Sequence, residues 1–546
     1  MEARSLEAIH DVDTLRRMVQ ERDAELSGRD KVIAARDALV ARHEHTLRER
    51  DALIGKLTHE LARLRRIQFA ARSERMDAVQ RGLFEEAMAE DIATVEAQVE
   101  ATQASAPAAR PADQRPRRQP LPPELERITT VHEPASCQCA ACGGALVKIG
   151  EQVSEKLDVK PIELFVRREV YPQYACRACE QVIAEPVAPA IIDRGMAAPG
   201  LLAQIVVQKY VDHLPLYRQE AIYARHGISL PRSTLAEWVG RIGLALEPLV
   251  QALKERLRRS SVLHADETPV SQLDPGAGKT KRAYLFVYRT AGASPVVLFD
   301  YGSSRSGKHA AAFLGDWKGA LMVDDYAGYK ALFATGITEL GCWAHARRKF
   351  FDVHAASSSP MAKEALERFA RIYAIEAELA DLEPGDRYRE RQARLAPCLA
   401  ELRTWLEGLQ PKVLGNSGLA GAISYTLKRW DALARALDDG RYPLDNNAAE
   451  NAIRPIALGR KNWLFAGSES AGKRAAAIMG LLATARANGR DPQAWLTDVL
   501  TRLPTTKMRD IDTLLPVGSS ASLSGDPKIQ PDSSDAGTQS SASAAP

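Results

Sequence analysis

The chain has 546 residues, 45% of them hydrophobic, and a mean hydropathy of −0.26. Because a single hydrophobic core rarely grows beyond about 300 residues, this length predicts several domains. The 73 basic and 70 acidic side chains nearly cancel, so net charge identifies no partner, and a nucleic-acid surface must come from local clusters. No run of about 18 apolar residues is present, and the segment after Met1 lacks the apolar core of a secretory signal. We therefore expect no membrane partner and a cytoplasmic location.

Residues 12 to 61 carry apolar side chains at strict seven-residue spacing. A sustained heptad repeat predicts a left-handed coiled coil. The second position of the expected seam is mostly Arg or Asp, which favours weak self-association, and a solvated single helix is the alternative. Further along, Ala101 to Pro123 is rich in Ala, Pro, Gln and Arg and predicts a linker. The repeat positions are Val12, Val19, Leu26, Ile33, Val40, Leu47, Ile54 and Leu61.

Five of the seven cysteines lie between Cys137 and Cys179, which indicates a local metal site in a reducing compartment. Two Cys-x-x-Cys pairs supply four thiolates, the donor set of a tetrahedral Zn²⁺ that is structural because no position stays open for water. Alternation of apolar and polar residues from 163 to 171 predicts a β-hairpin that brings the pairs together. Spacing alone does not decide whether Cys137 replaces Cys139. The expected zinc ligands are Cys139, Cys142, Cys176 and Cys179.

Residues 216 to 239 predict two helices with a turn at Gly227. This is the pattern of a helix-turn-helix, whose second helix enters a major groove of DNA. Thr234 and Glu237 have the spacing of a capping box, which predicts the start of that second helix. Bihelical units that only pack a core show the same pattern. For contact with DNA, Arg232 and Ser233 are the candidate residues.

Two apolar strands in the second half of the chain run directly into acidic residues. The first ends in Asp266 and Glu267, and a later one ends in Asp324 and Asp325. Because neighbouring side chains on a strand point to opposite faces, Asp266 and Glu267 are expected to face opposite ways. Further strand-like runs lie between these two at 282–289 and 294–300, and a helical segment follows from about 354 to 440.

Glu450 begins a predicted helix and is followed by the cations Arg454, Arg460 and Lys461. Taken alone, its spacing from Asn447 fits a capping box, and its spacing from Arg454 fits an i, i+4 ion pair. Together with the two strand-end acids it favours a metal site instead. Mg²⁺ prefers oxygen ligands, and a few carboxylates hold two such ions in sites for in-line displacement at phosphate. Clustered carboxylates repel one another, so this site is expected to be partly protonated until metal binds.

Several long motifs of the chain resemble those of the insertion-sequence 66 family of transposases. They occur in the family's order, together with the heptad segment, the four-cysteine module and the predicted helix-turn-helix. The resemblance therefore covers nearly the whole chain apart from the linker and the tail. The motifs are His264-Ala-Asp-Glu-Thr-Pro269, Val323-Asp-Asp-Tyr-Ala-Gly-Tyr329, Gly341-Cys-Trp-Ala-His-Ala-Arg-Arg-Lys-Phe350, Asn446-Asn-Ala-Ala-Glu450 and Gly459-Arg-Lys-Asn-Trp-Leu-Phe465.

The resemblance implies a ribonuclease-H-like core and a catalytic triad, here Asp266, Asp324 and Glu450, that binds two Mg²⁺ or Mn²⁺ ions. The family pattern favours Asp324 over Asp325 as the second ligand. The chain departs from the pattern at Asn451, where the family usually has Arg. The implied activity is cleavage of DNA at the terminal inverted repeats of an insertion element and strand transfer into target DNA. The residues expected to contact DNA phosphates are His345, Arg347, Arg348, Lys349, Arg454, Arg460 and Lys461. For the first four of them, a solvated basic helix face is the alternative.

The implied partners are double-stranded DNA, as element ends and as target, a second copy of the chain through the N-terminal helix, and accessory proteins of the same element. Such a protein would act on the nucleoid. Two other functions fit parts of the sequence: a catalytically inert DNA-binding regulator, and a ribonuclease-H-like nuclease without strand transfer. A complete set of three acids argues against the inert regulator, which has no need of them.

The sequence thus predicts a multidomain α/β protein. Its expected parts are a heptad coiled-coil helix (1–68), a helical segment with a Pro-rich linker (69–124), a zinc-binding module (125–187), a helix-turn-helix region (190–255), a catalytic domain (256–475) with its helical insertion (about 354–440), a C-terminal helical segment (476–512) and a disordered tail (513–546).

Overall fold

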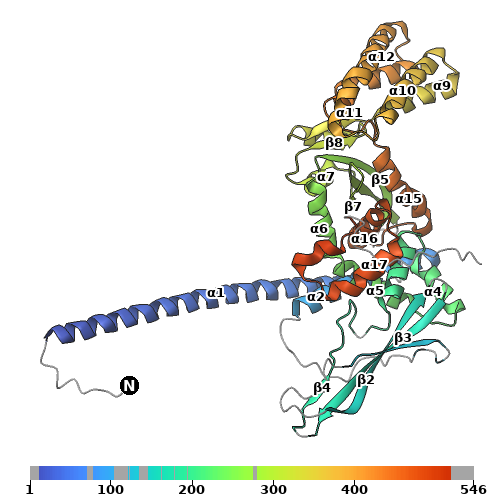
Figure 1. Ribbon diagram of the computed structural model, residues 1–546. Coiled ribbons are helices and arrows are strands. Elements are labelled where there is room, and N and C mark those ends of the chain that lie inside the picture. Colours follow the sequence, from blue (N-terminus) through green and yellow to red (C-terminus); the bar gives the residue numbers. More distant parts are fainter. Residues whose placement is uncertain are drawn as a thin grey trace, which may run out of the picture.

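The computed structural model describes residues 12–70, 78–103, 121, 123, 125–133, 146–160, 163–177, 179–193, 195–274 and 279–517. A central α/β body carries three projections: a long helix, a β-hairpin and a helical lobe (Figure 1). None of the described helices combines the length and the apolar character needed to cross a lipid bilayer.

The strands form two separate sheets. The strands are β1 (Arg127–Val131), β2 (Leu146–Lys160), β3 (Glu163–Cys176), β4 (Val182–Ala184), β5 (Val262–Asp274), β6 (Lys279–Thr290), β7 (Val297–Gly302), β8 (Ala320–Val323) and β9 (Thr338–Gly341). The α-helices are α1 (Val12–Ala70), α2 (Ala78–Gln103), α3 (Pro199–Tyr210), α4 (Leu216–Arg225), α5 (Arg232–Ala245), α6 (Glu247–Arg258), α7 (Gly307–Leu314), α8 (Lys330–Phe333), α9 (Trp343–Ser357), α10 (Pro360–Glu378), α11 (Pro384–Glu390), α12 (Ala396–Leu409), α13 (Gly418–Lys428), α14 (Trp430–Ala434), α15 (Asn447–Trp463), α16 (Glu469–Ala487) and α17 (Pro492–Arg502).

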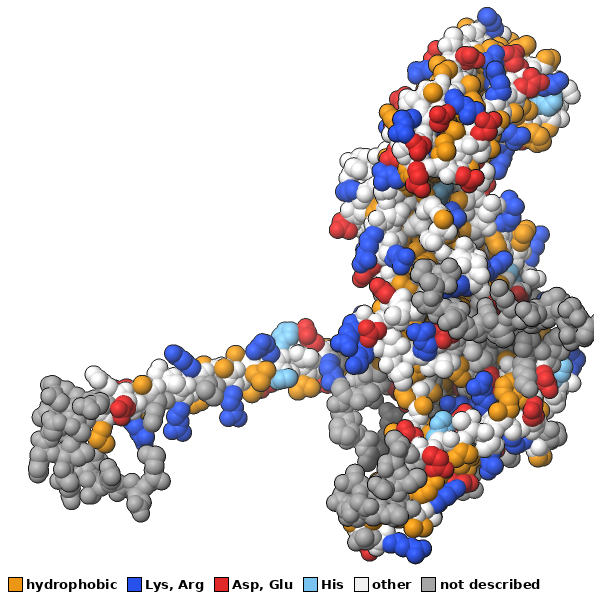
Figure 2. Space-filling view, viewed as in Figure 1, with side chains coloured by type: hydrophobic (Ala, Val, Ile, Leu, Met, Phe, Trp, Pro, Cys, Tyr) orange, Lys and Arg blue, Asp and Glu red, His pale blue; other side chains and the backbone are white. Residues whose placement is uncertain are grey.

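Helix α1 confirms the helix predicted from the heptad repeat, and most of it stands clear of the body (Figure 1). Its C-terminal part packs on α2, where Leu64 is buried and Arg65 pairs with Glu96 at 2.8 Å. On the N-terminal side of this contact the heptad side chains are 50–57% exposed. Apolar and basic side chains are interspersed along this projecting part of α1 (Figure 2). These exposed positions are Val19, Leu26, Ile33, Val40 and Leu47. The predicted self-association is not tested by a single chain.

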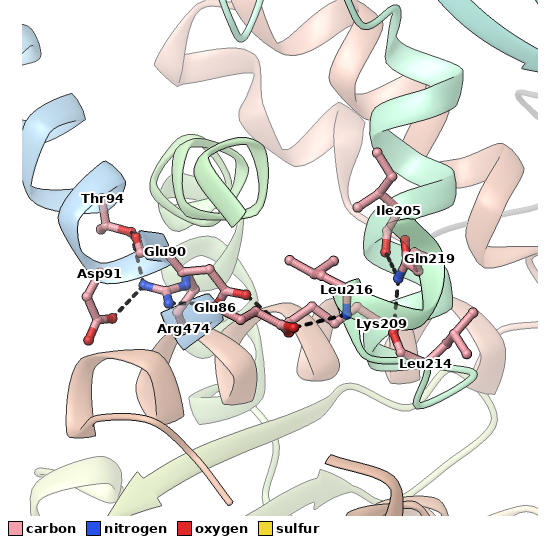
Figure 3. A network of polar contacts seen from close by, with 10 residues as sticks. All are labelled: Glu86, Glu90, Asp91, Thr94, Ile205, Lys209, Leu214, Leu216, Gln219 and Arg474. Carbon is pink, nitrogen blue, oxygen red and sulfur yellow. Dashed lines mark hydrogen bonds and ion pairs between the residues drawn. The ribbon is translucent and has the colours of Figure 1, made fainter. Parts of the chain in front are cut away.

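Helix α2 is fixed to the body by charged side chains that are almost fully buried (Figure 3). Glu86 and Glu90 both pair with Lys209 of α3, the second at 3.1 Å. Glu90 and Asp91 pair with Arg474 of α16 at 2.8 and 3.0 Å. Burial lowers the pKa of Lys209 and of Arg474, but the carboxylates outweigh it and raise both above their ordinary values. Both cations therefore stay charged, and α2 is held by a buried ionic network.

The predicted hairpin between the cysteine pairs is confirmed as the antiparallel strands β2 and β3. The register pairs Leu146 with Cys176, so the strand that follows the first cysteine pair begins opposite the second pair. Strand β1 adds to β3 in parallel and β4 adds in antiparallel. The turn end of the hairpin joins the body, because the paired residues Leu157 and Val166 are buried in the main core.

The predicted helix-turn-helix is present as α4 and α5, with Gly227 between them at φ 77°, a conformation that favours glycine. The capping box predicted from Thr234 and Glu237 is wrong. Helix α5 starts earlier, at Arg232, and lacks a side-chain cap on its N-terminal residue. Instead, the Arg232 N–H donates to the Glu220 carboxylate of α4 at 3.0 Å. The preceding helix therefore caps the second one.

Most of α5 is buried, and α2 covers one of its sides. The Thr94 hydroxyl of α2 donates to the Gly240 carbonyl at 3.2 Å, and a Cβ at Gly240 would lie 2.5 Å from the Glu90 carbonyl. Arg241 pairs with Glu100 of α2 at 3.0 Å. This close packing leaves the start of α5 as its accessible part, where Ser233 is exposed and Arg232 half-buried.

The central sheet has the order β7-β6-β5-β8-β9. Strands β5, β6 and β7 pair in antiparallel fashion, which confirms the strands predicted in this region. Strands β8 and β9 run parallel to β5, with Val262 opposite Ala320 and His264 opposite Met322. Helix α15 packs on β5 and α16 packs on β7. The short strand β9 was not predicted.

Helices α9 to α14 form the lobe between β9 and α15, at the top of Figure 1. The lobe has its own core, built around Trp343, Phe350 and Phe369. The predicted helical segment from 354 to 440 is indeed helical, although the helix that enters it already begins at Trp343.

The C-terminal helix α17 and the short 3₁₀ turn after it complete the main core. Leu514, Leu515 and Val517 are buried there, so the disordered tail predicted from residue 513 begins too early. Residues 518–546 of that predicted tail lie outside the described residues, as does the linker from 104 to 120.

Candidate active site

Asp266 lies on β5, the middle strand of the central sheet. Its carboxylate accepts the Glu267 N–H at 2.8 Å. Burial raises the pKa of Asp266 to about 7, and the negative charges of Glu267, Asp324 and Glu450 add to this rise. All three candidate acids therefore lie within electrostatic reach of one another.

Asp324 directly follows β8, the parallel neighbour of β5. His264 of β5 lies opposite Met322 of β8. Asp266 and Asp324 each lie two residues further along these two neighbouring segments of the chain. Neighbouring strands run about 4.8 Å apart, so this register brings the two acids side by side. The Asp324 carboxylate accepts the Tyr326 N–H at 2.9 Å.

Asp325 has a different environment from Asp324. Its exposed carboxylate pairs with Arg429 at 2.5 Å and with Lys330 at 3.1 Å. Burial alone would raise the pKa of Asp325, but Lys330 and Arg429 outweigh it and hold the pKa below its ordinary value. Asp325 is thus engaged by protein cations, while Asp324 faces the other acids.

Glu450 lies in the first turn of α15 and faces α9. One carboxylate oxygen, Oε2, accepts a hydrogen bond from Arg348 at 3.3 Å, and the other, Oε1, lies 3.6 Å from His345 Nδ1. Neither the capping box with Asn447 nor the ion pair with Arg454 forms among the described residues. Neither structural role predicted for Glu450 is therefore realised, and its carboxylate faces Arg348 and His345 of α9.

Asn446 fixes the start of α15 against β5. Its side chain is 1% exposed, donates to the Ala265 carbonyl at 2.8 Å, and lies 3.1 Å from His264 Nδ1. Burial lowers the pKa of His264 to about 4, so this imidazole is neutral at physiological pH and donates its Nδ1 proton to Asn446. Asn446 thereby ties Glu450 to the strand that carries Asp266.

Glu267 points away from Asp266, as the alternation of a strand predicts. Its carboxylate accepts hydrogen bonds from Arg305 at 2.9 Å and from the Tyr329 hydroxyl at 2.9 Å. These partners occupy Glu267 in the packing beneath the site, which separates its role from that of Asp266.

The cations expected at DNA phosphates fall into two groups around the site. Arg347, Arg348 and Lys349 are exposed on α9, and His345 is half-buried there. On α15, Arg454 and Lys461 are exposed, while Arg460 donates to Thr268 Oγ1 at 3.1 Å and to the Pro269 carbonyl. Arg460 thus binds the backbone of β5 and Arg348 binds Glu450, while the other arginines and lysines of these two helices are exposed near the acids. Lys461 and Arg460 also line a groove with Lys281 and Arg282 of β6.

Of the four expected zinc ligands, Cys176 ends β3 and is buried, and Cys179 lies in the exposed turn that follows. Cys139 and Cys142 lie outside the described residues, as does Cys137. The register of β2 and β3 places Leu146, which follows the first cysteine pair in the sequence, opposite Cys176.

Comparison with models of known protein families shows to which family this chain belongs. The family model described as "Transposase IS66 family" matches residues 194–474, a span that contains Asp266, Asp324 and Glu450. The chain belongs to the IS66 family of transposases. Three further models of this transposase match: a "zinc-finger binding domain of transposase IS66" at 136–180, an "IS66 C-terminal element" at 480–517 and "Transposase C of IS166 homeodomain" at 56–130.

The transposase also resembles curated proteins of Sinorhizobium fredii. It is 37% identical to uncharacterized protein y4qI over 533 residues, which covers 93% of this chain and 96% of that protein. It is 40% identical to uncharacterized protein y4jD over 412 residues, or 72% of this chain and 81% of that protein. The relatives support the family and carry no statement of activity.

Three side chains of the transposase near the acids were not singled out from the sequence: Asn446, His264 and Cys342. Asn446 and His264 stand inside the motifs of the resemblance, but their mutual hydrogen bond joins positions 182 residues apart and is invisible to local spacing. Cys342 and His345 do carry a signal, since Cys-x-x-His is a spacing used by metal ligands. Their proximity to Glu450 emerges only from the fold.

Proposed function

We propose that this transposase binds the terminal inverted repeats of its insertion element, cleaves DNA there and transfers the cut strands into target DNA. The observation that carries the proposal is the convergence of Asp266, Asp324 and Glu450 from a central strand, its parallel neighbour and the first turn of α15. Burial raises the pKa of Asp266, and the negative charges of Glu267, Asp324 and Glu450 add to the rise.

The sheet supports a ribonuclease-H-like core. Three antiparallel strands followed by two that run parallel to the first give the order β7-β6-β5-β8-β9, with the acids at the centre. The lobe of α9 to α14 is inserted between β9 and the helix that carries Glu450. This is the position at which we predicted the helical insertion of the catalytic domain.

The donor set fits Mg²⁺ or Mn²⁺. All three side chains offer oxygen, and Glu450 Oε1 is buried with no hydrogen-bond partner among the described residues. Asp266, Asp324 and Glu450 would hold the two ions, which supply activation of the attacking oxygen and stabilisation of the leaving oxygen. The pairing of Asp325 with Arg429 and Lys330 supports Asp324 as the second ligand.

The surrounding side chains would orient these acids and the DNA. Asn446 holds Glu450 against β5, and Arg348 neutralises one of its oxygens. The exposed side chains of Arg347, Lys349 and Arg454 would bind phosphates, and we extend this role to His345, Arg460 and Lys461. At the body's other DNA-binding unit, Arg232 and Ser233 at the start of α5 would contact the element end, because α2 covers one side of that helix. Phosphate contacts of this kind make binding strongly dependent on salt.

The remaining modules complete the proposal. Cys139, Cys142, Cys176 and Cys179 would hold one structural Zn²⁺, which metal analysis of the purified protein would detect as about one equivalent per chain. Helix α1 would pair with α1 of a second copy, because the apolar heptad side chains from Val19 to Leu47 are exposed in a single chain. Accessory proteins of the same element are further proposed partners, and the expected place of action is chromosomal DNA in the cytoplasm.

The test is a cleavage assay on a labelled DNA end from the element, with Mg²⁺ and purified protein. Glu450→Gln is expected to abolish cleavage while end binding persists, because it removes a ligand charge and little volume. The matched control is Glu469→Gln, an exposed acid at the start of α16 that pairs with Lys473 at 2.7 Å. Full cleavage by Glu450→Gln would overturn the triad.

The same assay separates the other two functions. An inert regulator binds the end and leaves it uncut even as wild type. A nuclease without strand transfer releases cut ends, but no joined product forms when a target duplex is added. The transposase proposal requires both the cut and the joined product.

A further inference from the structure

A second cluster of metal-binding side chains shares Glu450 with the proposed catalytic centre. Cys342, His345 and Glu450 place one sulfur, one nitrogen and one oxygen within 4.8 Å of one another. The cluster joins the start of α9 to the first turn of α15, because Cys342 immediately precedes α9 and His345 lies in its first turn.

Two atoms of this cluster are left without partners. His345 Nδ1 and Glu450 Oε1 are both buried, stand 3.6 Å apart, and have no hydrogen-bond partner among the described residues. Buried polar atoms without partners are uncommon in folded proteins. Arg348 binds the opposite carboxylate oxygen, so Oε1 remains directed at the imidazole. An ion or a water between these atoms would satisfy both.

The sulfur of Cys342 is held in place by the backbone. The Asn446 N–H donates to Cys342 Sγ at 3.2 Å, and the side chain is 1% exposed. Hydrogen bonds of this kind orient metal ligands from outside the coordination shell. Asn446 is also the residue that ties α15 to β5, so one residue positions both the thiol and Glu450.

We propose that Cys342, His345 and Glu450 form a site for a thiophilic divalent ion such as Zn²⁺, distinct from the oxygen-only centre and from the four-cysteine module. Thiolate and imidazole ligands select Zn²⁺ over Mg²⁺, whereas carboxylates alone suit Mg²⁺. Three protein ligands leave a fourth position for water. On binding, the thiol releases its proton to solvent and the ion takes its place.

Glu450 belongs to both sites, which gives the second site a regulatory consequence. An ion held by Cys342 and His345 draws Glu450 away from Asp266 and Asp324. Zinc is therefore expected to inhibit Mg²⁺-dependent cleavage. This inhibition rests on the proposed function, whereas the binding of zinc does not.

Binding is tested by titrating ZnCl₂ into protein whose four-cysteine module is already loaded, without DNA. Wild type is expected to take up about one further equivalent. Cys342→Ser and His345→Ala are expected to take up none. The matched control is Cys398→Ser, which changes a half-buried cysteine in the lobe and should bind as wild type. Uptake that persists in Cys342→Ser, or no uptake by wild type, would overturn the site.

A spectroscopic arm shows whether sulfur is a ligand. Co²⁺ is added to protein in which zinc fills the four-cysteine module alone. The near-ultraviolet absorption of a cobalt thiolate should then appear in wild type and in Cys398→Ser, and not in Cys342→Ser. Unfolding of Cys342→Ser would be recognised by circular dichroism, and Cys342→Ala then serves as the second variant. A wild type without this absorption band would contradict coordination by Cys342.

The inhibitory consequence is read in the cleavage assay, as the rate with zinc relative to each protein's own rate without it. Wild type should lose cleavage as the added site fills, and Cys342→Ser should keep its own rate. Equal zinc inhibition of both proteins would refute the competition for Glu450. If no protein cleaves DNA, the proposed function fails, while the titration still decides the site.

Discussion

The transposase contains a group of buried acids and a group of half-buried acids that the fold treats in opposite ways. Glu86, Glu90 and Asp91 on α2 are matched by buried Lys209 and Arg474 (Figure 3). Among the described residues, the cations paired with the carboxylates of Asp266, Asp324 and Glu450 are limited to Arg348, which donates to Glu450, and His345 at 3.6 Å from it. Buried charge is stable only when paired or when it binds a metal. The first group therefore fastens α2 to α3 and α16, and we propose that the second group binds metal cations.

The largest expected difference between two variants is that between the sequence neighbours Asp324, which belongs to the second group, and Asp325, which does not. Asp324→Ala is expected to lower end cleavage by on the order of 1,000-fold, since a lost metal ligand removes several kcal/mol of transition-state stabilisation. Asp325→Ala is expected to lower it by less than about tenfold, because Asp325 already pairs with Arg429 and Lys330. The rates of single-turnover cleavage measure both. The reverse order would move the second ligand to Asp325.

Removing a cation from the first group should destabilise the fold. Arg474→Met leaves Glu90 and Asp91 buried without their partner, which is expected to lower the free energy of unfolding by about 3–5 kcal/mol. Urea unfolding followed by tryptophan fluorescence measures the change. Arg502→Met is the control, because its exposed pair with Asp498 is worth about 1 kcal/mol or less. Equal effects of the two variants would show that the buried network does not hold α2.

Removing an acid from the second group should increase the free energy of unfolding of the metal-free protein. In the metal-free protein Asp266 has a pKa of about 7, against an ordinary value of 3.8. The folded state then binds a proton that the unfolded chain has released, so stability falls as the pH rises through this window. Asp266→Asn is therefore expected to be more stable than wild type at pH 8 by on the order of 2–4 kcal/mol, and the gain should vanish near pH 4.

Thermal unfolding without metal, from acid to alkaline pH, provides this measurement. Mg²⁺ should reduce the stability difference between Asp266→Asn and wild type at pH 8. It binds and stabilises the wild type, whereas the variant lacks one of the metal ligands. Asp325→Asn serves as the control with the opposite sign, since its pKa is lowered by its cations. An Asp266→Asn protein that is less stable than wild type at pH 8 would contradict the unpaired state of the acid.

The smallest expected effect concerns the cations that flank the acids. Arg454 is exposed and forms no ion pair with another described residue, so Arg454→Ala should weaken binding to an element end without loss of stability. The slope of log affinity against log salt should fall by about one. Arg502→Ala, far along the chain on α17, should leave the slope unchanged. An unchanged slope for Arg454→Ala would remove it from the DNA surface.

The sequence predicted those parts of the site that depend on local pattern. Apolar strands that lead to Asp266 and Asp324 were recognisable, and the alternation rule correctly turned Glu267 away. The predicted strand end at Asp266 is wrong, because β5 continues to Asp274 through its pairing with β6. The hairpin β2–β3 and the long helix α1 followed from their own periodicities. The strand β9 was missed because four residues are too few to show a period.

What the sequence did not predict depends on contacts between distant segments. Spacing suggested that Glu450 caps its own helix, whereas the fold turns it to α9 and gives it Arg348. The start of α5 was misplaced because Glu220 of another helix supplies the cap. Helix α2 gave no sign that it would bury Glu90 against Arg474, since both residues look like ordinary surface charges in the sequence.

The central claim is that Asp266, Asp324 and Glu450 bind divalent metal together. Fe²⁺, added with ascorbate and peroxide in place of Mg²⁺, generates radicals that cut the peptide chain close to the bound ion. The fragments of wild type should end near Asp266 and Asp324, and they should disappear with excess Mg²⁺ or in Glu450→Gln. Cuts confined to other regions, or the same cuts in Glu450→Gln, would contradict the site.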